Sequence, residues 1–277
     1  MHLENYLQEY LKLGINRISI GFQSFDADIL SYLDRIHSPE DCIVTYNNLR
    51  EIGFTNINAD LIFSIPGQSL DRWIQDLNTL IKLEPEHISI YSLTVEKGTP
   101  LYRSVKNGLT TMPTEEFDYK MYSNAIEYLQ NNNYNQYEIS NFALQNKECK
   151  HNLHYWNLDN YLAFGPSAHG HDNKIRWWNV RSLDTYIKKL SNNELPISGK
   201  EILNKKDMYN ELLYNGLRLS SGIKIEKLIK VYPNKDFNNY LNYNIDKWKH
   251  YLNKSDILKL NNKGLMIADT IASDMFI

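Results

Sequence analysis

Three short apolar segments, separated by helical segments, restrict the fold of this chain more than any other feature of its sequence. Residues 17–24 (RISIGFQS), 56–65 (NINADLIFSI) and 87–95 (HISIYSLTV) are apolar and β-branched, as strands buried on both faces are. Their starts are spaced by roughly 30–40 residues, the length of one strand–helix unit. The pattern predicts an α/β fold with a parallel sheet.

Helix signals lie around these segments. Ser38 precedes a proline and two acidic residues, which is typical of a helix N-terminus, and this helix is predicted to end at Gly53. A second helix is predicted to begin at Ser69, because apolar residues follow it at helical spacing. Residues 3–13 and 114–131 also predict helices.

The second half of the chain has a different character. Residues 134–144 predict one more strand, and from about residue 182 the pattern is mostly helical, over 184–190, 205–217, 223–231 and 237–252. The segments 258–260 and 265–267, joined by NNKG, predict a small hairpin. We therefore predict two domains, an α/β domain over 1–180 and a helical, winged-helix-like domain over 181–277.

The start of the chain predicts an incomplete barrel. Three parallel strands cannot close a barrel, and the first of them would expose a hydrophobic edge. The helix predicted over residues 3–13 is typical of a crossover from an earlier strand. We therefore expect an N-terminal half of the barrel to be missing from this chain, and either an upstream segment or a separate protein to supply it.

Composition excludes several classes of protein. The net charge of -3 and the lack of a basic recognition helix argue against a nucleic-acid partner. Cys42 and Cys149 are the only two cysteines, which argues for a reducing compartment. The sequence contains no apolar run of the ~20 residues that a membrane span needs. We expect a cytoplasmic globular protein.

Polar residues near the ends of the predicted strands are candidates for ligand binding, because α/β folds place ligands there. Gly21 and Gln23 follow the first strand, and Asp60 interrupts the apolar run of the second. A buried carboxylate needs a partner. Asp60 therefore either bonds to backbone amides as a structural residue or binds a ligand hydroxyl. Arg35 is either a ligand contact or a surface ion pair.

The segment 149–171 (CKHNLHYWNLDNYLAFGPSAHGH) concentrates one cysteine and four histidines. Three interpretations remain open for it: a zinc site, a packing cluster, or a site for a flat apolar macrocycle beside an imidazole. The spacing of its cysteine and histidines matches no compact zinc module. These residues are Cys149, His151, His154, His169 and His171.

Several motifs, in order along the chain, resemble one family. They are GINRISIGFQSFD, LDRIHSPED, NADLIFSIPGQS, HISIYSLTVEKGTP, HNLHYW, YLAFGPSAHG, GLRLSSGI and GLMIADTIASDMF. Together they resemble the radical SAM coproporphyrinogen-oxidase-like proteins, from about residue 3 to the C-terminus. HNLHYW is similar to the HNxxYW motif of the HemW-type heme chaperones. The resemblance implies part of a radical SAM (β/α) barrel, its C-terminal half, followed by the helical domain.

The resemblance also implies roles for particular residues. Gln23, Arg35 and Asp60 match positions that hold S-adenosylmethionine (SAM), with Asp60 on the ribose hydroxyls, and the backbone near Thr94 would face the adenine. His151 matches the motif histidine and is the expected axial ligand of heme iron.

Tyr155 and Trp156 complete the expected heme site, since they are the aromatic pair of the same motif. The family's CxxxCxxC loop, which holds a [4Fe-4S] cluster through three thiolates, has no counterpart here. We therefore expect this chain to be inactive in radical chemistry when it is alone.

The resemblance implies two alternative functions. One is a heme chaperone that binds heme and delivers it to apo-proteins such as respiratory enzymes, with peripheral contact to membrane proteins. The other is an oxygen-independent coproporphyrinogen III oxidase-like enzyme of porphyrin biosynthesis. The HNLHYW motif favours the chaperone.

Overall fold

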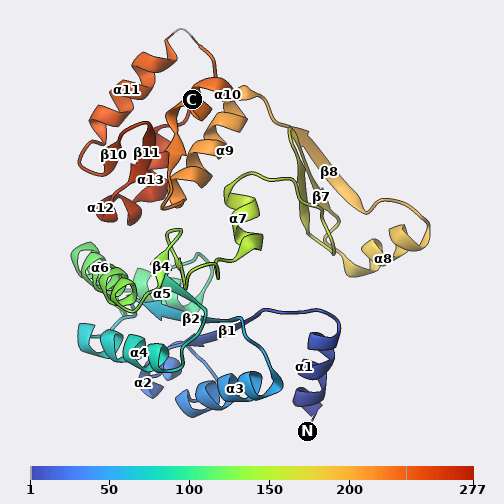
Figure 1. Ribbon diagram of the computed structural model, residues 1–277, viewed down its shortest axis with the longest axis vertical. Helices are drawn as coiled ribbons and strands as arrows, with labels where there is room; N and C mark the ends of the chain where they lie inside the picture. Colours follow the sequence, from blue (N-terminus) through green and yellow to red (C-terminus); the bar gives the residue numbers. More distant parts are fainter. Residues whose placement is uncertain (1, 235) are drawn as a thin grey trace. The chain divides into compact units, whose positions relative to one another are not determined.

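The computed structural model describes residues 2–234 and 236–277 and shows a mixed α/β protein (Figure 1). The chain divides into two compact units, Met1–Glu148 and Cys149–Ile277. This division differs from the boundary predicted at residue 180. The reason is that residues 150–179 pair and pack within the C-terminal unit, where Lys150–Trp156 lies against a later helix and Ile175–Asn179 pairs with a later strand.

The first unit is built on a sheet of five strands in the order β1-β2-β3-β5-β4. β1 (Ile18–Gln23), β2 (Ile57–Phe63) and β3 (His87–Ser92) are parallel, so the three strands predicted from the sequence are confirmed. Within the described residues the sheet is open, with β1 at one edge and β4 (Asn135–Gln136) at the other.

The single strand predicted over residues 134–144 is wrong. The segment forms two short strands, β4 and β5 (Asn141–Ala143), which pair antiparallel to each other, and β5 is also antiparallel to β3. The chain turns between them because the Glu138 carboxylate accepts hydrogen bonds from the backbone N–H of Ser140 and the amide of Asn141. A side chain that binds the backbone two residues further on favours a turn over a continuous strand.

The helices of the first unit begin and end close to the predicted residues. The capping box of Ser38 and Asp41 starts α3 (Pro39–Ile52), and Gly53 ends it with a left-handed φ of 111°. Figure 1 shows α3 and α4 on the same side of the sheet. The helices are α1 (His2–Lys12), α2 (Ala27–Tyr32), α3, α4 (Leu70–Lys82), α5 (Pro100–Lys106) and α6 (Glu115–Asn131).

The core of this unit lies between the helices and one face of the sheet. Every second residue of β2, from Ile57 to Phe63, is buried there. Phe63 packs against Trp73 of α4 and stacks on Tyr122 of α6. Asn58 and Asp60 of β2 face the other way, together with Ile62, and we call this side of the sheet its polar face.

The second unit contains a helix, an antiparallel sheet with one helix inserted, and a group of helices around a second small sheet. The first sheet has the order β6-β7-β8, and α8 connects β7 to β8 at the far end of that hairpin (Figure 1). These elements are α7 (Lys150–Trp156), β6 (His169–Asp172), β7 (Ile175–Asn179), α8 (Leu183–Ser191) and β8 (Ile197–Ile202).

The predicted helices of the C-terminal region are present, with three corrections. The helix predicted over 223–231 begins at Ile225, because residues 223–224 form a short strand. The helix predicted over 237–252 ends at Lys247, and the hairpin predicted over 258–267 is wrong because residues 262–265 are helical. The Asn261 side chain accepts hydrogen bonds from the N–H groups of Lys263 and Gly264 and so starts a helix there.

The first strand predicted for this hairpin, over residues 258–260, is present as part of β11, but it pairs with two earlier strands and gives a sheet in the order β10-β11-β9. The elements are α9 (Lys205–Arg218), β9 (Ile223–Lys224), α10 (Ile225–Val231), α11 (Phe237–Lys247), β10 (Leu252–Lys254), β11 (Ile257–Leu260), α12 (Asn262–Leu265) and α13 (Ala268–Asp274). None of the helices in the described part of the chain has both the length and the apolar composition needed to cross a membrane.

Candidate functional site

The polar face of the parallel sheet carries two rows of in-register residues. Ser19 of β1 lies opposite Asn58 of β2, which lies opposite His87 of β3. The next row toward the carboxyl ends is Gly21, Asp60 and Ser89. Register partners in a sheet project to the same face, so both rows face away from the core described above.

Asn58 is the centre of a hydrogen-bond network on this face. Its Nδ2 donates to Asp60 Oδ1 at 2.7 Å and to Ser19 Oγ at 2.6 Å. Its Oδ1 accepts from the Ser89 hydroxyl at 3.1 Å and from Nδ1 of His87. Because Asn58 is buried, these four bonds fix the orientation of its amide and, through it, the Asp60 carboxylate.

His87 is the innermost member of the network. The ring is fully buried, and burial lowers the pKa of His87 to about 3, so the imidazole is neutral. Since Nδ1 donates to the Asn58 carbonyl oxygen, Nε2 is the acceptor, and the Tyr137 hydroxyl lies 2.8 Å from it. The network therefore has a single consistent arrangement of donors and acceptors.

Asp60 meets partners in the middle of β2 and does not end the strand. It is half-buried, and in addition to the Asn58 bond its Oδ2 accepts from the Ser19 hydroxyl at 3.2 Å. A carboxylate has about four acceptor sites. The described bonds occupy two of them, which leaves capacity for a ligand hydroxyl.

The side chain of Gln23 lies close to Asp60, because it covers Gly21, the register partner of Asp60 on β1. Gln23 ends β1 with a φ of 67°, a left-handed conformation that is uncommon for a residue other than glycine. Its side chain folds over Gly21, where an added Cβ would lie 2.6 Å from the amide nitrogen of Gln23. The structure thus brings Gln23 and Asp60 to one place on the sheet, with the missing side chain of Gly21 leaving room between them.

Arg35 and Thr94, the other two expected SAM contacts, lie on exposed segments. Arg35 follows α2, and its side chain makes no ion pair with any described residue. Thr94 follows β3, and its hydroxyl donates to the Ser92 carbonyl oxygen at 3.4 Å. The structure describes no hydrogen bond from either residue to Gln23 or Asp60.

The loop that follows Gln23 is held by the buried carboxyl group of Asp76 in α4. Asp76 Oδ2 accepts from the Ser24 hydroxyl and Oδ1 from the Phe25 N–H, both at 2.7 Å. Burial raises the pKa of Asp76 to about 6, against the effect of these two bonds. The folded protein therefore binds a proton at Asp76 more tightly than the unfolded chain does.

We expect this proton to make stability depend on pH. Since the pKa of Asp76 is raised on folding, its contribution is fully present below about pH 4 and is lost as the pH rises through 6. The free energy of unfolding of the native chain relative to that of Asp76→Asn should therefore fall, by on the order of 2 kcal/mol, between pH 4 and 7. Urea unfolding of both proteins across this range measures it, and a constant difference would contradict it.

The HNLHYW segment is helical and forms most of α7. His151 and Tyr155 are four residues apart and lie on the same exposed side, with His151 Nε2 and the Tyr155 hydroxyl 3.0 Å apart. Trp156 turns instead toward α9, where the Arg218 guanidinium lies 4.7 Å from the centre of its ring. Its buried Nε1 donates to no described residue. The structure therefore brings His151 and Tyr155 together but gives Trp156 a different direction.

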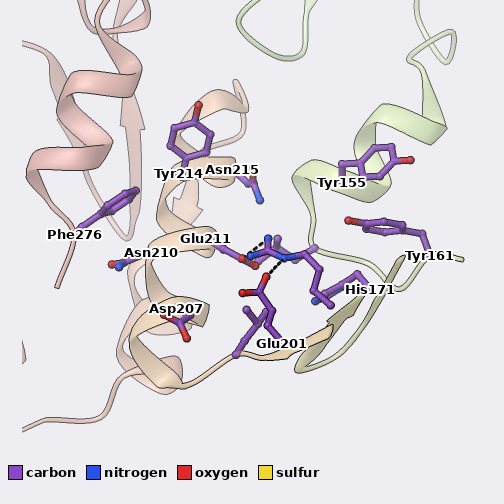
Figure 2. A pocket seen from close by; sticks show the side chains of 13 residues that line it. Tyr155, Tyr161, His171, Glu201, Asp207, Asn210, Glu211, Tyr214, Asn215 and Phe276 are labelled. Carbon is purple, nitrogen blue, oxygen red and sulfur yellow. Dashed lines mark hydrogen bonds and ion pairs between the residues drawn. The ribbon is translucent and has the colours of Figure 1, made fainter. Parts of the chain in front are cut away.

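A row of aromatic rings continues from α7 to β6. The Tyr155 and Tyr161 rings are 4.6 Å apart between centroids, and those of Tyr161 and His171 are 5.8 Å apart. The two tyrosines and His171 line a cavity of about 540 Å³ (Figure 2). The HNLHYW helix thus contributes Tyr155 to the rim of a cavity that lies wholly within the C-terminal unit.

The β6-β7-β8 sheet and α9 form opposite walls of this cavity. His171, Arg176 and Glu201 are in-register neighbours on the three strands. The residues that α9 contributes lie on one helical face and include Asp207, Asn210, Glu211 and Tyr214. Figure 2 shows Glu201 of the sheet and Glu211 of α9 pointing toward each other.

Arg176 connects the two walls. Its Nε lies 2.6 Å from Glu201 and its Nη1 lies 2.7 Å from Glu211. Burial raises the pKa of Glu211, although Arg176 opposes the shift. These two ion pairs connect the sheet to α9 on either side of the cavity. The lining of the cavity carries more negative than positive charge.

Sequence analysis did not identify Arg176, Glu201 or Glu211 as site residues. The polar residues of α9 follow helical spacing, so one wall could have been recognised within the helix predicted over 205–217. The other wall depends on the register of three strands, for which the sequence carries no comparable signal.

The described cysteines do not fit an iron–sulfur cluster. Burial raises the pKa of the Cys42 thiol, in α3, to about 11, which disfavours the thiolate that iron needs. Cys149 is buried in the other unit. Among residues 2–234 and 236–277, no three His, Cys, Asp or Glu side chains are arranged to hold a metal ion.

Comparison with known proteins gives three findings. A profile of the radical SAM superfamily matches residues 1–80. The heme chaperone HemW of Bacillus subtilis is 35% identical over 219 residues, covering 79% of this chain and 58% of that protein. The heme chaperone HemW of Buchnera aphidicola subsp. Schizaphis graminum is 34% identical over 266 residues, covering 95% of this chain and 69% of that protein.

One solved structure has the same fold over nearly the whole chain. Coproporphyrinogen III oxidase (HemN) from Escherichia coli, a radical SAM enzyme, superposes with a TM-score of 0.78 at 17% identity, covering 99% of this chain and 67% of that structure. This likeness confirms the predicted radical SAM type of α/β fold. The chain spans between 55% and 58% of the length of the HemW proteins from Bacillus subtilis, Lactococcus lactis and Mycobacterium tuberculosis.

Proposed function

This chain belongs to the HemW family of heme chaperones, and we propose that it binds heme beside its HNLHYW helix and delivers the heme to apo-proteins. One observation carries the proposal. His151 and Tyr155 share the exposed side of α7, and Tyr155 also lines the cavity of about 540 Å³. This volume lies within the range of about 300–1,000 Å³ typical of small-molecule sites.

His151 is the proposed ligand of the heme iron on this surface. Its Nε2 is engaged with the Tyr155 hydroxyl, so binding iron requires that bond to be exchanged. The bond is exposed to water and is therefore easily replaced. Tyr155 and Trp156 would supply aromatic surface for the macrocycle next to the imidazole. Tyr155 lies on the same side of α7 as His151, whereas Trp156 lies on the side that faces Arg218.

We further propose that the polar face of the parallel sheet holds S-adenosylmethionine. Gln23 and Asp60 would bind it at Gly21, with Asp60 on the ribose hydroxyls, while Arg35 and Thr94 would contact it from the adjoining loops. In radical SAM proteins this cofactor is the source of a radical. Because the described cysteines do not fit the cluster, no radical step is assigned, and the SAM site is proposed to be structural or regulatory.

The recipients are proposed to be apo-hemoproteins, including respiratory enzymes, so that the chaperone would contact membrane proteins from the cytoplasm. The alternative function, an oxygen-independent coproporphyrinogen III oxidase-like enzyme, has less support. The likeness to coproporphyrinogen III oxidase is one of fold at 17% identity, whereas the HemW proteins are matched at 34–35%.

The heme proposal is tested by titrating the chain with hemin. We expect His151→Ala to weaken binding about tenfold or more and to shift the Soret band, because iron loses a nitrogen ligand. His154→Ala is the matched control, since His154 lies on the same helix but pairs with Asp159 at 2.8 Å. Equal affinity and equal spectra for the native chain and His151→Ala would remove His151 from the site.

A further inference from the structure

The cavity between α9 and the β6-β7-β8 sheet carries negative charge that its own lining does not balance. Three carboxylates line it, those of Glu201, Asp207 and Glu211, and Arg176 is the one arginine or lysine among the described lining residues. Three carboxylates against one guanidinium leave two negative charges around a space of about 540 Å³. Carboxylates that are partly removed from water need positive partners, so the cavity favours a cationic ligand.

Glu201 and Glu211 each keep one oxygen atom for such a ligand. Arg176 binds Oε1 of Glu201 at 2.6 Å and Oε1 of Glu211 at 2.7 Å. The structure describes no bond to Oε2 of either residue. Burial raises the pKa of Glu211 even though Arg176 is beside it, which indicates that its negative charge is not fully compensated.

His171 adds a buried acceptor that is independent of the acidic residues. Its side chain is only 6% exposed, and its Nδ1 lies 3.2 Å from the Asp159 carbonyl oxygen. A carbonyl oxygen only accepts, so Nδ1 carries the hydrogen of the neutral ring and Nε2 keeps its lone pair. The structure describes no partner for Nε2, and the ring lines the cavity on the same sheet as Glu201 (Figure 2).

An alkylammonium group matches this set of acceptors. The free acceptors come from three elements, β6, β8 and α9, and an ammonium group has three N–H donors. A metal ion fits less well, since no three His, Cys, Asp or Glu side chains within the described residues are arranged to hold one. Leu203 and Phe276 also line the cavity and supply apolar surface for an aliphatic chain.

Asp207 provides a second position for positive charge. Asp207 and Glu211 are four residues apart on one face of α9, which places them about 6 Å apart along the helix axis. Oδ2 of Asp207 accepts from the Asn204 N–H at 2.9 Å, and the structure describes no bond to its Oδ1. A four-carbon chain carries two ammonium groups at a similar separation. A dication of this length would balance both excess charges.

We propose that this cavity binds an aliphatic diamine. One ammonium group would donate to Glu201, Glu211 and His171, and the other to Asp207. His151 is not among the described residues that line the cavity, so the diamine and the heme proposed beside α7 are separate ligands. The inference therefore goes beyond the proposed function and does not depend on it.

The first test compares three ligands of the native chain by isothermal titration calorimetry. They are 1,4-diaminobutane, 1-aminobutane, which lacks one ammonium group, and 1,4-butanediol, which lacks both. We expect the diamine to bind about tenfold more tightly than the monoamine, because it makes a second charge-assisted hydrogen bond. The diol should give no measurable binding.

The second test removes one carboxylate at a time. Glu211→Gln and Asp207→Asn keep the shape of each side chain, and both should weaken diamine binding about tenfold. Asp207→Asn should bind 1-aminobutane as the native chain does, since the single ammonium group sits at Glu211. Asparagine at 207 can still accept from the Asn204 N–H, so the start of α9 is preserved.

Glu194→Gln is the matched control for these variants. It changes the net charge by the same amount within the same unit, but Glu194 pairs with Lys189 at 3.6 Å and does not line the cavity. Its affinity for the diamine should equal that of the native chain.

Nitrogen NMR of the histidine rings tests the role of His171 directly. Adding 1,4-diaminobutane should move the Nε2 resonance of His171, because its lone pair becomes a hydrogen-bond acceptor. The resonances of His169 should stay in place, since His169 lies against Trp178 outside this cavity.

Four results would overturn the diamine site. They are binding of the diol as tight as that of the diamine, equal weakening in Glu194→Gln and Glu211→Gln, an unmoved His171 Nε2 resonance, and tighter binding of N-acetyl-lysine amide than of the diamine. The last result would assign the cavity to a lysine side chain of a protein partner. Hemin binding is measured separately, so failure of the diamine site leaves the proposed heme function standing.

Discussion

Replacing Asn58 with leucine should lower the free energy of unfolding by about 3 kcal/mol, because it leaves buried donors without acceptors. Leucine fills a similar volume but cannot accept from Nδ1 of His87 or from the Ser89 hydroxyl. Neither group reaches water easily, since His87 is fully buried and Ser89 nearly so. Urea unfolding of the native chain and Asn58→Leu measures the loss.

Asn56→Ala is the matched control for this prediction. Asn56 lies two residues earlier, and its buried Oδ1 has no hydrogen-bond partner among the described residues. Removing it should cost well under half as much as Asn58→Leu. Equal losses for the two variants would show that the Asn58 network adds nothing beyond ordinary packing.

The Asn58→Leu replacement should also weaken the binding of a ligand hydroxyl by Asp60. Asn58 holds Asp60 Oδ1 at 2.7 Å, so without it the carboxylate gains freedom that a ligand hydroxyl has to remove. If SAM binds as proposed, its affinity should fall in Asn58→Leu even where the protein remains folded, while Asn56→Ala leaves that affinity unchanged.

Replacing Gly170 with alanine should destabilise the C-terminal unit by about 2–3 kcal/mol through overpacking. Gly170 of β6 lies in register with Trp177 of β7, and an added Cβ would lie 2.2 Å from the indole ring. Either the ring or the strand must move.

A double-mutant cycle with Trp177→Ala separates this clash from other effects of the new methyl group. In the Trp177→Ala background the ring is absent, so the added methyl group should cost less than 1 kcal/mol. Thermal and urea unfolding of the four proteins give the coupling energy. Additive losses would mean that the indole ring is not what excludes a side chain at position 170.

Gly199 of β8 and Trp178 of β7 repeat this relation on the neighbouring strand pair, with an added Cβ 2.4 Å from the ring. Each tryptophan of β7 therefore covers a glycine of an adjacent strand. This packing makes the sheet stiff at the place where His171, Arg176 and Glu201 are presented to the cavity. A binding site gains precision when rigid elements carry it.

Local signals in the sequence were sufficient for most of the first unit. β1, β2 and β3 were predicted because buried parallel strands have continuous apolar, β-branched sequences. The start of α3 was predicted because Ser38 and Asp41 are a capping box, in which both residues act within one turn of helix. Signals of this kind need no knowledge of distant parts of the chain.

Predictions of secondary structure failed where the local residue composition is compatible with two different structures. Residues 134–144 have strand composition, but Glu138 binds the backbone after it and turns the chain. The NNKG segment has turn composition, yet the same Asn261 that favours a turn also caps a helix. The side-chain bond that decides between the outcomes is visible only in the folded protein.

The sequence by itself determined the parallel α/β unit, the HNLHYW segment, and Gln23 and Asp60 as polar residues within or next to buried strands. Each of these features depends on the types of residues that lie close together in the sequence, so it can be recognised without knowledge of the fold. Only the tertiary structure decided that Gln23 meets Asp60 over Gly21, that Trp156 turns away from His151, and that His171 joins Arg176 and Glu201 on one wall of a cavity. These relations depend on strand register and on helix–sheet packing, which are set by contacts between residues far apart in the chain.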